Sequence, residues 1–159
     1  MRAAALALAL VELPAVAQAA DASLLQRAAD FAAICQKHLP DVKAARAAFK
    51  TAGYRYEQSE QRLHYYSADG YRVVAAISST AADPKCVIGV SGMTPAEAES
   101  LLAPIIAASR AKPADPSGYF KADKIWKGTF NGGPMVMGVI NHVELGVLRG
   151  AAIVARAGE

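Results

Sequence analysis

The sequence lacks most of the motifs that identify catalytic and cofactor sites. It contains no C-x-x-C, no H-E-x-x-H, no pair of histidines at metal-ligand spacing, no P-loop and no G-x-G-x-x-G. Redox, zinc and nucleotide sites of the usual kinds are therefore not indicated. The acidic residues are scattered, and nothing in their spacing selects a general acid and base. We predict no catalytic residue, no metal site and no cofactor.

Long charged or apolar runs are also missing after the N-terminus. Seventeen Lys and Arg residues against 14 Asp and Glu residues give a net charge of +3, without a basic cluster. Nucleic acid is therefore not an expected partner. No later segment is apolar for long enough to span a bilayer, so we expect no stable membrane insertion.

What the chain does have at its start is the pattern of an export signal. Met1-Arg2 is positive, Ala3 to Val11 is an unbroken apolar run, and an A-x-A pattern follows Pro14 and ends at Ala19. This order is typical of a signal peptide over residues 1–19, although a buried N-terminal helix is an alternative. We expect a periplasmic or secreted protein, with residues 20–159 forming one domain.

The two cysteines are expected to behave differently in an exported chain than in a cytosolic one. Cys35 and Cys86 are the only thiols, and an oxidising compartment favours a bond between them. We predict a structural disulfide; two buried free thiols, or a redox or metal role, are the alternatives. The nearby Ser91 is not in a nucleophile elbow, because Gly92 comes one residue too early for G-x-S-x-G.

Helix signals are strong at three places. Leu24, Ala28, Phe31 and Cys35 recur at helical spacing after a capping Asp or Ser, and Asp41 is placed to cap a second helix. Thr94-Pro95-Ala96-Glu97 has the composition of a capping box and predicts a helix from Pro95 to Ser109. Pro104 is expected to kink or shorten this third helix.

The remaining segments favour strands. Alternating or continuous apolar runs are separated by turn signals such as Asp69-Gly70 and Asn131-Gly132. The composition of 111–118 indicates a loop or linker. We predict the α+β class: an antiparallel β-sheet of about six strands with two or three helices packed on it.

The order of these signals suggests two related halves. Residues 41–92 and 94–157 each have a helix, a Gly-Tyr pair, strands, a glycine turn and a final apolar strand. This is compatible with a duplicated α-β-β-β unit, but any helix followed by a meander would use similar turn residues.

Tyrosine and basic side chains are concentrated on the first strands. The residues considered for a binding surface are Tyr54, Tyr56, His64, Tyr65, Tyr66 and Arg72, with Arg55, Arg62 and Tyr71 close in sequence. Such a patch suits a sugar ring or a protein partner, whereas the alternative is tyrosines that pack in the core. Alternation separates Tyr65 from His64 and Tyr66. His38, His64 and His142 are isolated, which indicates structural roles.

These observations predict an exported, non-catalytic binding or accessory protein whose partner is a protein or a cell-envelope component. A small envelope hydrolase with a dispersed active site is the alternative. A deep pocket that joins a histidine to a carboxylate would favour the enzyme, and an aromatic-rimmed surface would favour binding.

Overall fold

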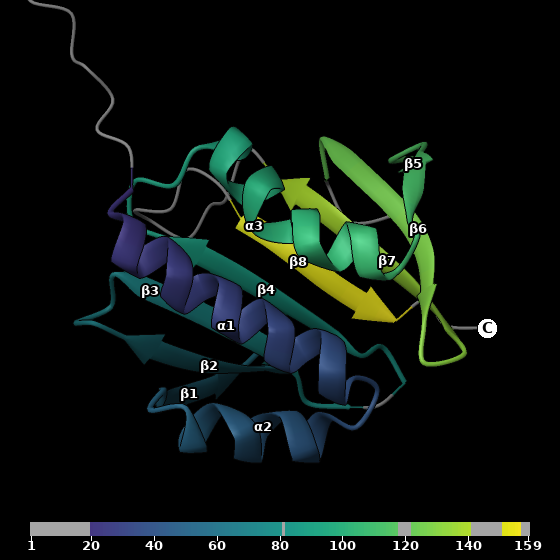
Figure 1. Cartoon of the computed structure of the whole chain (residues 1–159). Coiled ribbons are helices and arrows are strands. Elements are labelled where there is room, and N and C mark those ends of the chain that lie inside the picture. Colours follow the sequence, from purple (N-terminus) through teal and green to yellow (C-terminus); the bar gives the residue numbers. More distant parts are fainter. Residues whose placement is uncertain (1–19, 81, 118–121, 141–150, 157–159) are drawn as a thin grey trace, which may run out of the picture.

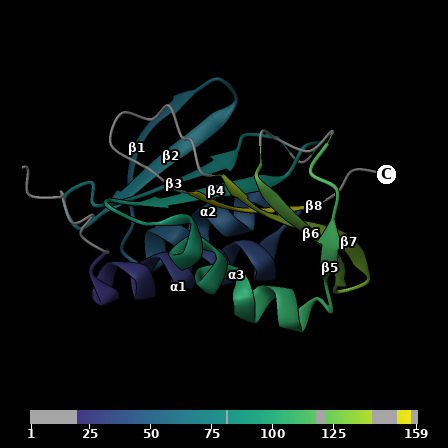
Figure 2. The same ribbon diagram turned by 90° about the horizontal axis from the view of Figure 1, so that it is seen from above.

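The computed structural model describes residues 20–80, 82–117, 122–140 and 151–156. In these residues, three helices pack against one face of an antiparallel sheet of eight strands (Figure 1). Seen from above, all three helices lie on the same side of the sheet (Figure 2). The predicted α+β class is confirmed, with eight strands instead of about six. The predicted signal peptide, 1–19, lies outside the described residues.

Each helix begins where the sequence supplies a cap. Helix α1 spans Ala22–His38 and is capped by Asp21, while α2 spans Val42–Thr51 and is capped by Asp41. Both aspartate side chains accept a hydrogen bond from a backbone N–H of the first turn, which would otherwise lack a partner. Gly53, which follows the end of α2, has a φ of +82°, the left-handed value that glycine adopts after the C-terminus of a helix.

The third helix, α3, spans Pro95–Ala108 and starts with the predicted capping box. The Thr94 hydroxyl accepts from the backbone N–H of Glu97, and the Glu97 carboxylate accepts from the backbone N–H of Thr94. Pro104 lies inside the helix without ending it. The Pro104 side chain is exposed, so its ring lies outside the core.

The strands form a single sheet in the order β1-β2-β3-β4-β8-β7-β6-β5. Their bounds are β1 Arg55–Glu60, β2 Leu63–Ala68, β3 Val73–Ser78, β4 Lys85–Val90, β5 Lys112–Ala114, β6 Lys124–Phe130, β7 Gly133–Ile140 and β8 Ala151–Arg156. All neighbouring strands are antiparallel. The stretch predicted as a loop, 111–118, contributes β5, because three of its residues pair with β6 despite the proline among them.

The sheet consists of two four-stranded meanders joined at its centre by β4 and β8. Helix α1 packs chiefly against β4 and β3, and α3 packs chiefly against β7 and β8. The helix that corresponds in position to α3 is therefore α1, whereas the suggested halves began with α2. Each unit also has four strands, not three. Whether the halves arose by duplication stays a prediction.

A disulfide fastens the first helix to the sheet. Cys35 of α1 is bonded to Cys86 of β4, and both side chains are fully buried. The predicted pairing is therefore confirmed. Neighbouring positions on the helix-facing side of β4, Ile88 and Val90, are also fully buried. The bond lies inside the apolar layer between helices and sheet, where it has a structural role.

Candidate binding pocket on the helix-free face

The structure distributes the six residues of the predicted tyrosine patch among several places. Tyr54 and Tyr66 are buried between the helices and the sheet, in edge-to-face contact with Phe49. The Tyr54 hydroxyl donates to the backbone carbonyl of Arg27, and burial raises the pKa of Tyr54 far above its usual range. The Tyr66 hydroxyl accepts from Nε of Arg46 at 3.1 Å. These two rings belong to the core.

Tyr56 and His64 lie together on the helix-facing side of β1 and β2. Their rings are 6.1 Å apart, and Tyr56 is 41% exposed. Burial, followed by the charge of Arg46, lowers the pKa of His64. The buried Nδ1 of His64 has no hydrogen-bond partner among the described residues. An imidazole with a lowered pKa that packs against the Tyr56 ring in this way is a packing group.

Arg72 and Tyr65 lie elsewhere. Arg72 precedes β3 and forms an ion pair of 3.9 Å with Asp21, the cap of α1. Tyr65 pairs with Ala76 of β3 on the face of the sheet opposite to the helices, one position from Tyr66 on the other face. The predicted separation of Tyr65 from its neighbours is therefore seen in the register. Of the six residues, only Tyr65 lies at the pocket described next with its ring on the open face.

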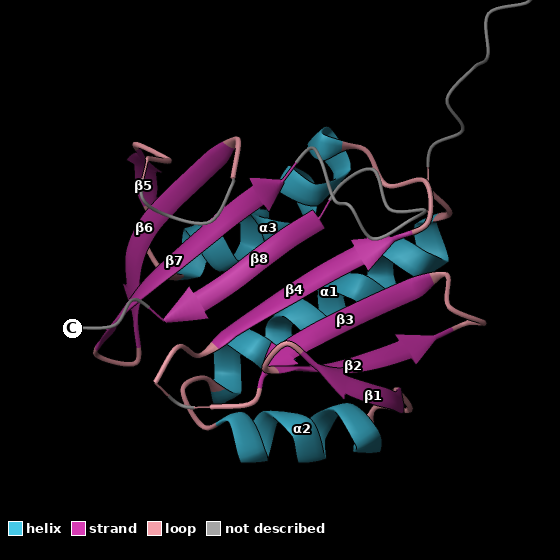
Figure 3. Ribbon diagram, turned by 180° about the vertical axis from the view of Figure 1, so that it is seen from behind, coloured by secondary structure: helices cyan, strands magenta, loops and turns pink. Residues whose placement is uncertain are grey.

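The helix-free face carries a pocket of about 430 Å³ over β1, β2 and β3. Figure 3 views the sheet from this side, with the helices behind it. The residues that line the pocket are Glu57, Gln58, Tyr65, Tyr66, Ser67, Tyr71 and Val74. Its volume is in the range of small-molecule sites, which is about 300 to 1,000 Å³. In this pocket, tyrosine rings lie close to an ionised carboxylate, that of Glu57.

A β-bulge places Glu57 in this pocket. The register of β1 with β2 shifts between Tyr56, which is opposite Tyr66, and Gln58, which is opposite Tyr65. Glu57 is therefore the extra residue of β1. A bulge breaks the strict alternation of faces. It can therefore direct a side chain toward a site that this side chain could not reach from a regular strand.

Three side chains hold the Glu57 carboxylate. Oε1 accepts hydrogen bonds from the hydroxyl of Ser67 and, at 2.7 Å, from Nε of Arg55. Oε2 accepts from the hydroxyl of Tyr71 at 2.7 Å. These hydrogen bonds, from Ser67 first and then Tyr71, lower the pKa of Glu57 to about 2. The carboxylate is therefore ionised at any physiological pH.

Tyr71 reaches the carboxylate by means of an unusual backbone. Asp69, Gly70 and Tyr71 have successive φ values of +53°, +66° and +68°. The left-handed region costs a bulky residue about 1 to 3 kcal/mol, and such strain is often found at functional sites. Strand β3 therefore begins two residues after Tyr71, at Val73.

The Tyr71 ring also meets a cation. The guanidinium carbon of Arg55 lies 5.2 Å from the ring centroid, within the range of a cation–π contact. The ring itself is 54% exposed. The hydrogen bond to Glu57 raises the pKa of Tyr71, so its hydroxyl remains a donor at neutral pH. Arg55, Glu57 and Tyr71 thus form one connected group at the rim of the pocket.

This arrangement is suited to recognition and poorly suited to acid–base catalysis. A general acid needs a pKa close to the working pH, and that of Glu57 is several units lower. No second carboxylate and no histidine is among the residues that line the pocket. Groups of three or more potential metal ligands are not found in the described part of the chain. His142 lies outside the described residues.

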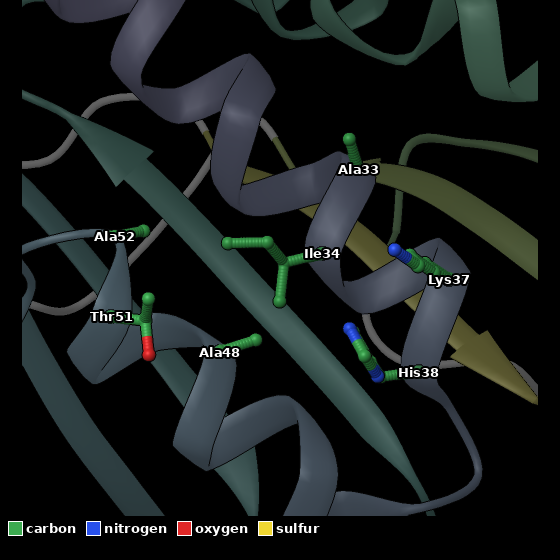
Figure 4. A pocket seen from close by; sticks show the side chains of 7 residues that line it. All are labelled: Ala33, Ile34, Lys37, His38, Ala48, Thr51 and Ala52. Carbon is green, nitrogen blue, oxygen red and sulfur yellow. The ribbon is translucent and has the colours of Figure 1, made fainter.

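A second hollow, of about 510 Å³, lies between α1 and α2, on the other side of the molecule (Figure 4). Its floor is formed by small or apolar residues such as Ile34 and Ala48, and Lys37 and His38 extend toward it from the last turn of α1. Basic residues at that position also interact favourably with the carbonyl end of a helix. The described residues that line this hollow include no acidic side chain.

The sequence did not indicate the centre of the pocket. Glu57 and Ser67 were not selected, since a bulge leaves no mark on the alternation of a polar strand. Tyr71 and Arg55 were noted only as neighbours in sequence. The one available signal was the Asp69-Gly70 turn directly before Tyr71, because a glycine turn can direct the next side chain back across the sheet.

The described residues contain no helix with the length and apolar character needed to cross a membrane. Comparison with family models, curated proteins and solved structures finds no match for this chain.

Proposed function

We propose that this chain is an exported, non-catalytic binding protein of the cell envelope, and that its ligand occupies the pocket around Glu57. The observation that carries the proposal is the Glu57 carboxylate, which is ionised, hydrogen-bonded on both oxygens and placed between exposed tyrosine and arginine side chains. Tyrosine and arginine are the residues most often found at energetically important contacts. The partner is a protein or another envelope component.

The disulfide and the N-terminal sequence support the location. A buried disulfide is most stable in an oxidising compartment, and the pattern of residues 1–19 is that of a cleaved signal. Amino-terminal sequencing of the protein in the periplasmic fraction or the medium tests this part. We expect a chain that begins at Ala20. An uncleaved chain in the cytoplasm would contradict export.

The alternative of a small hydrolase would require a proton donor or nucleophile in the pocket. The ionised Glu57 is a weak base and cannot donate a proton at neutral pH. Binding is therefore favoured over hydrolysis.

Pull-down from an envelope extract tests the binding site. The double variant Tyr65→Ala, Tyr71→Ala removes both pocket tyrosines, whereas Tyr56→Ala removes an exposed tyrosine from the opposite side of β1. We expect the partner to be lost with the double variant and kept with the control. Equal recovery with wild type, control and double variant would remove the pocket from the proposal. Circular dichroism of each variant establishes that the fold is retained.

A further inference from the structure

The pocket carries information about the chemical class of its ligand. Its single charged lining residue, among those described, is Glu57, and the Arg55 guanidinium is bonded to that carboxylate at 2.7 Å. The ion pair leaves little uncompensated charge at the centre of the pocket. A charged ligand would have to displace an existing partner or lie beside a like charge, which is unfavourable. A neutral ligand avoids both the displacement of a partner and the repulsion by a like charge.

Hydrogen-bonding capacity remains at the rim of the pocket. A carboxylate oxygen has two lone pairs, and Oε2 of Glu57 accepts a hydrogen bond from Tyr71 with one of them. Arg55 donates to Glu57 through Nε and also interacts with the Tyr71 hydroxyl, but a guanidinium carries five N–H donors, so donors remain. An acceptor and several donors therefore lie side by side. Vicinal hydroxyl groups, each of which both donates and accepts, complement such a pair.

Aromatic surface adjoins these polar groups. Tyr65 and Tyr71 line the pocket with Val74, and one face of the Tyr71 ring is covered by Arg55. The apolar faces of a sugar ring can pack on aromatic rings while its hydroxyl groups reach polar side chains at the ring edge. Tyrosine provides this surface at low cost in conformational entropy, because it has only two side-chain torsions.

Two backbone irregularities fix the geometry before a ligand arrives. The bulge places Glu57, and the left-handed Tyr71 brings its hydroxyl to the same carboxylate. Neither feature is needed for the pairing of β1 with β2, which continues on both sides of the bulge. Both irregularities act on the Glu57 carboxylate. This is the strongest indication that Arg55, Glu57 and Tyr71 have a function beyond packing. Preorganisation of this kind favours binding.

From these features we infer that the pocket binds a neutral saccharide of the cell envelope, with Tyr65 and Tyr71 contacting a sugar ring and Glu57 and Arg55 bonding its vicinal hydroxyl groups. This inference rests on the proposed function, since it names the ligand class for the same pocket. The probes are three neutral tetrasaccharides, cellotetraose, maltotetraose and chitotetraose, which differ in linkage, configuration and substitution. Agmatine, a guanidinium compound, is the cationic comparison.

Titration of the full chain, followed by two-dimensional NMR, tests the inference. We expect at least one tetrasaccharide, at concentrations up to about 10 mM, to shift the resonances of Tyr65, Ser67 and Tyr71 with saturation. Glu57→Gln should weaken that binding by about tenfold or more, because a charged acceptor makes the stronger hydrogen bond. Glu99→Gln, the same change at an ion-paired carboxylate of α3 that does not line the pocket, should leave affinity within about twofold.

The outcomes separate the ligand class from the proposed function. No response to any tetrasaccharide, or a response equal in wild type and Glu57→Gln, overturns the saccharide inference. Saturable binding of agmatine at the same residues, without saccharide binding, also overturns it. If the pull-down still depends on Tyr65 and Tyr71 in these cases, the binding function stands with another ligand. If the pull-down is independent of them as well, both proposals fail.

Discussion

Tyr71 donates a hydrogen bond of 2.7 Å to Oε2 of Glu57, although the two residues are 14 positions apart and belong to different parts of the first meander. The contact needs both a bulge in β1 and a left-handed tyrosine before β3. It links local backbone geometry to the electrostatics of the pocket, and its consequences can be measured.

The first prediction concerns the titration of Glu57. Its pKa is about 2 in the folded chain and near 4.5 when unperturbed. A lowered folded pKa means that the carboxylate stabilises the fold above pH 4.5, and that this contribution is lost as pH falls from about 4.5 to 2. Tyr71→Phe removes one of the donors, so the pKa of Glu57 should rise toward 4.5. Side-chain carbon NMR measures it directly.

The pH dependence of stability provides the control for this titration. In urea unfolding, the difference between wild type and Glu57→Gln should shrink as pH is lowered through that window. A difference that grows at low pH would contradict the assignment of the lowered pKa.

The second prediction concerns the disulfide between Cys35 and Cys86. The two residues are 51 positions apart, and closing a loop of this size is worth about 4 kcal/mol in the chain-entropy model. The double variant Cys35→Ala, Cys86→Ala should lose roughly this much free energy of unfolding. Urea unfolding compares it with the oxidised wild type. A loss below about 1 kcal/mol would contradict a loop-closure contribution of this size.

The third prediction compares two hairpin turns. Gln61 and Arg62 join β1 to β2 with φ values of +49° and +66°, whereas Asn131 and Gly132 join β6 to β7 with +50° and +74°. Glycine adopts such values without strain. Arg62→Gly should therefore stabilise the chain by up to about 1 kcal/mol, and Gly132→Ala should destabilise it by about 1 kcal/mol. Thermal unfolding of both variants should give shifts of opposite sign.

The fourth prediction concerns the close approach of α3 to β6. The carbonyl of Ser109, the C-terminal cap of α3, accepts from the backbone N–H of Thr129, and a Cβ added at Gly128 would lie 2.5 Å from that oxygen. Gly128→Ala should therefore destabilise the chain by about 1 to 3 kcal/mol.

The matched control is Gly138→Ala in β7. The nearest atoms to a Cβ at Gly138 are 3.4 Å away, which is ordinary contact. We expect a change within about 1 kcal/mol for this variant. Equal losses for Gly128→Ala and Gly138→Ala, measured by urea unfolding, would contradict the steric explanation.

The sequence was sufficient for the features that depend on neighbouring residues. Helix caps at Asp41 and Thr94 and the turns at Asp69-Gly70 and Asn131-Gly132 have local causes, so their patterns predict them. The disulfide followed from having only two cysteines. These signals were enough for the α+β class.

Features that depend on distant partners were not predictable in the same way. Strand β5 contains Pro113 and forms because β6 offers it a partner. The bulge at Glu57 and the direction of Tyr71 depend on cross-strand contacts with Ser67 and Arg55. The periodicity of the sequence contains no information about such contacts. The candidate pocket was therefore missed even though a tyrosine-rich patch was noticed in the right part of the chain.

The pairing of β4 with β8 affects the order in which parts of the chain can fold. The strand that completes the middle of the sheet, Ala151–Arg156, is also the last described strand, so the two meanders can join only after nearly all of these residues are available. A polypeptide that stops before Ala151 would leave β4 and β7 with unpaired apolar edges. Such edges template aggregation and are targets of quality control. An incompletely synthesised chain is therefore expected to be degraded instead of accumulating in a partly folded form.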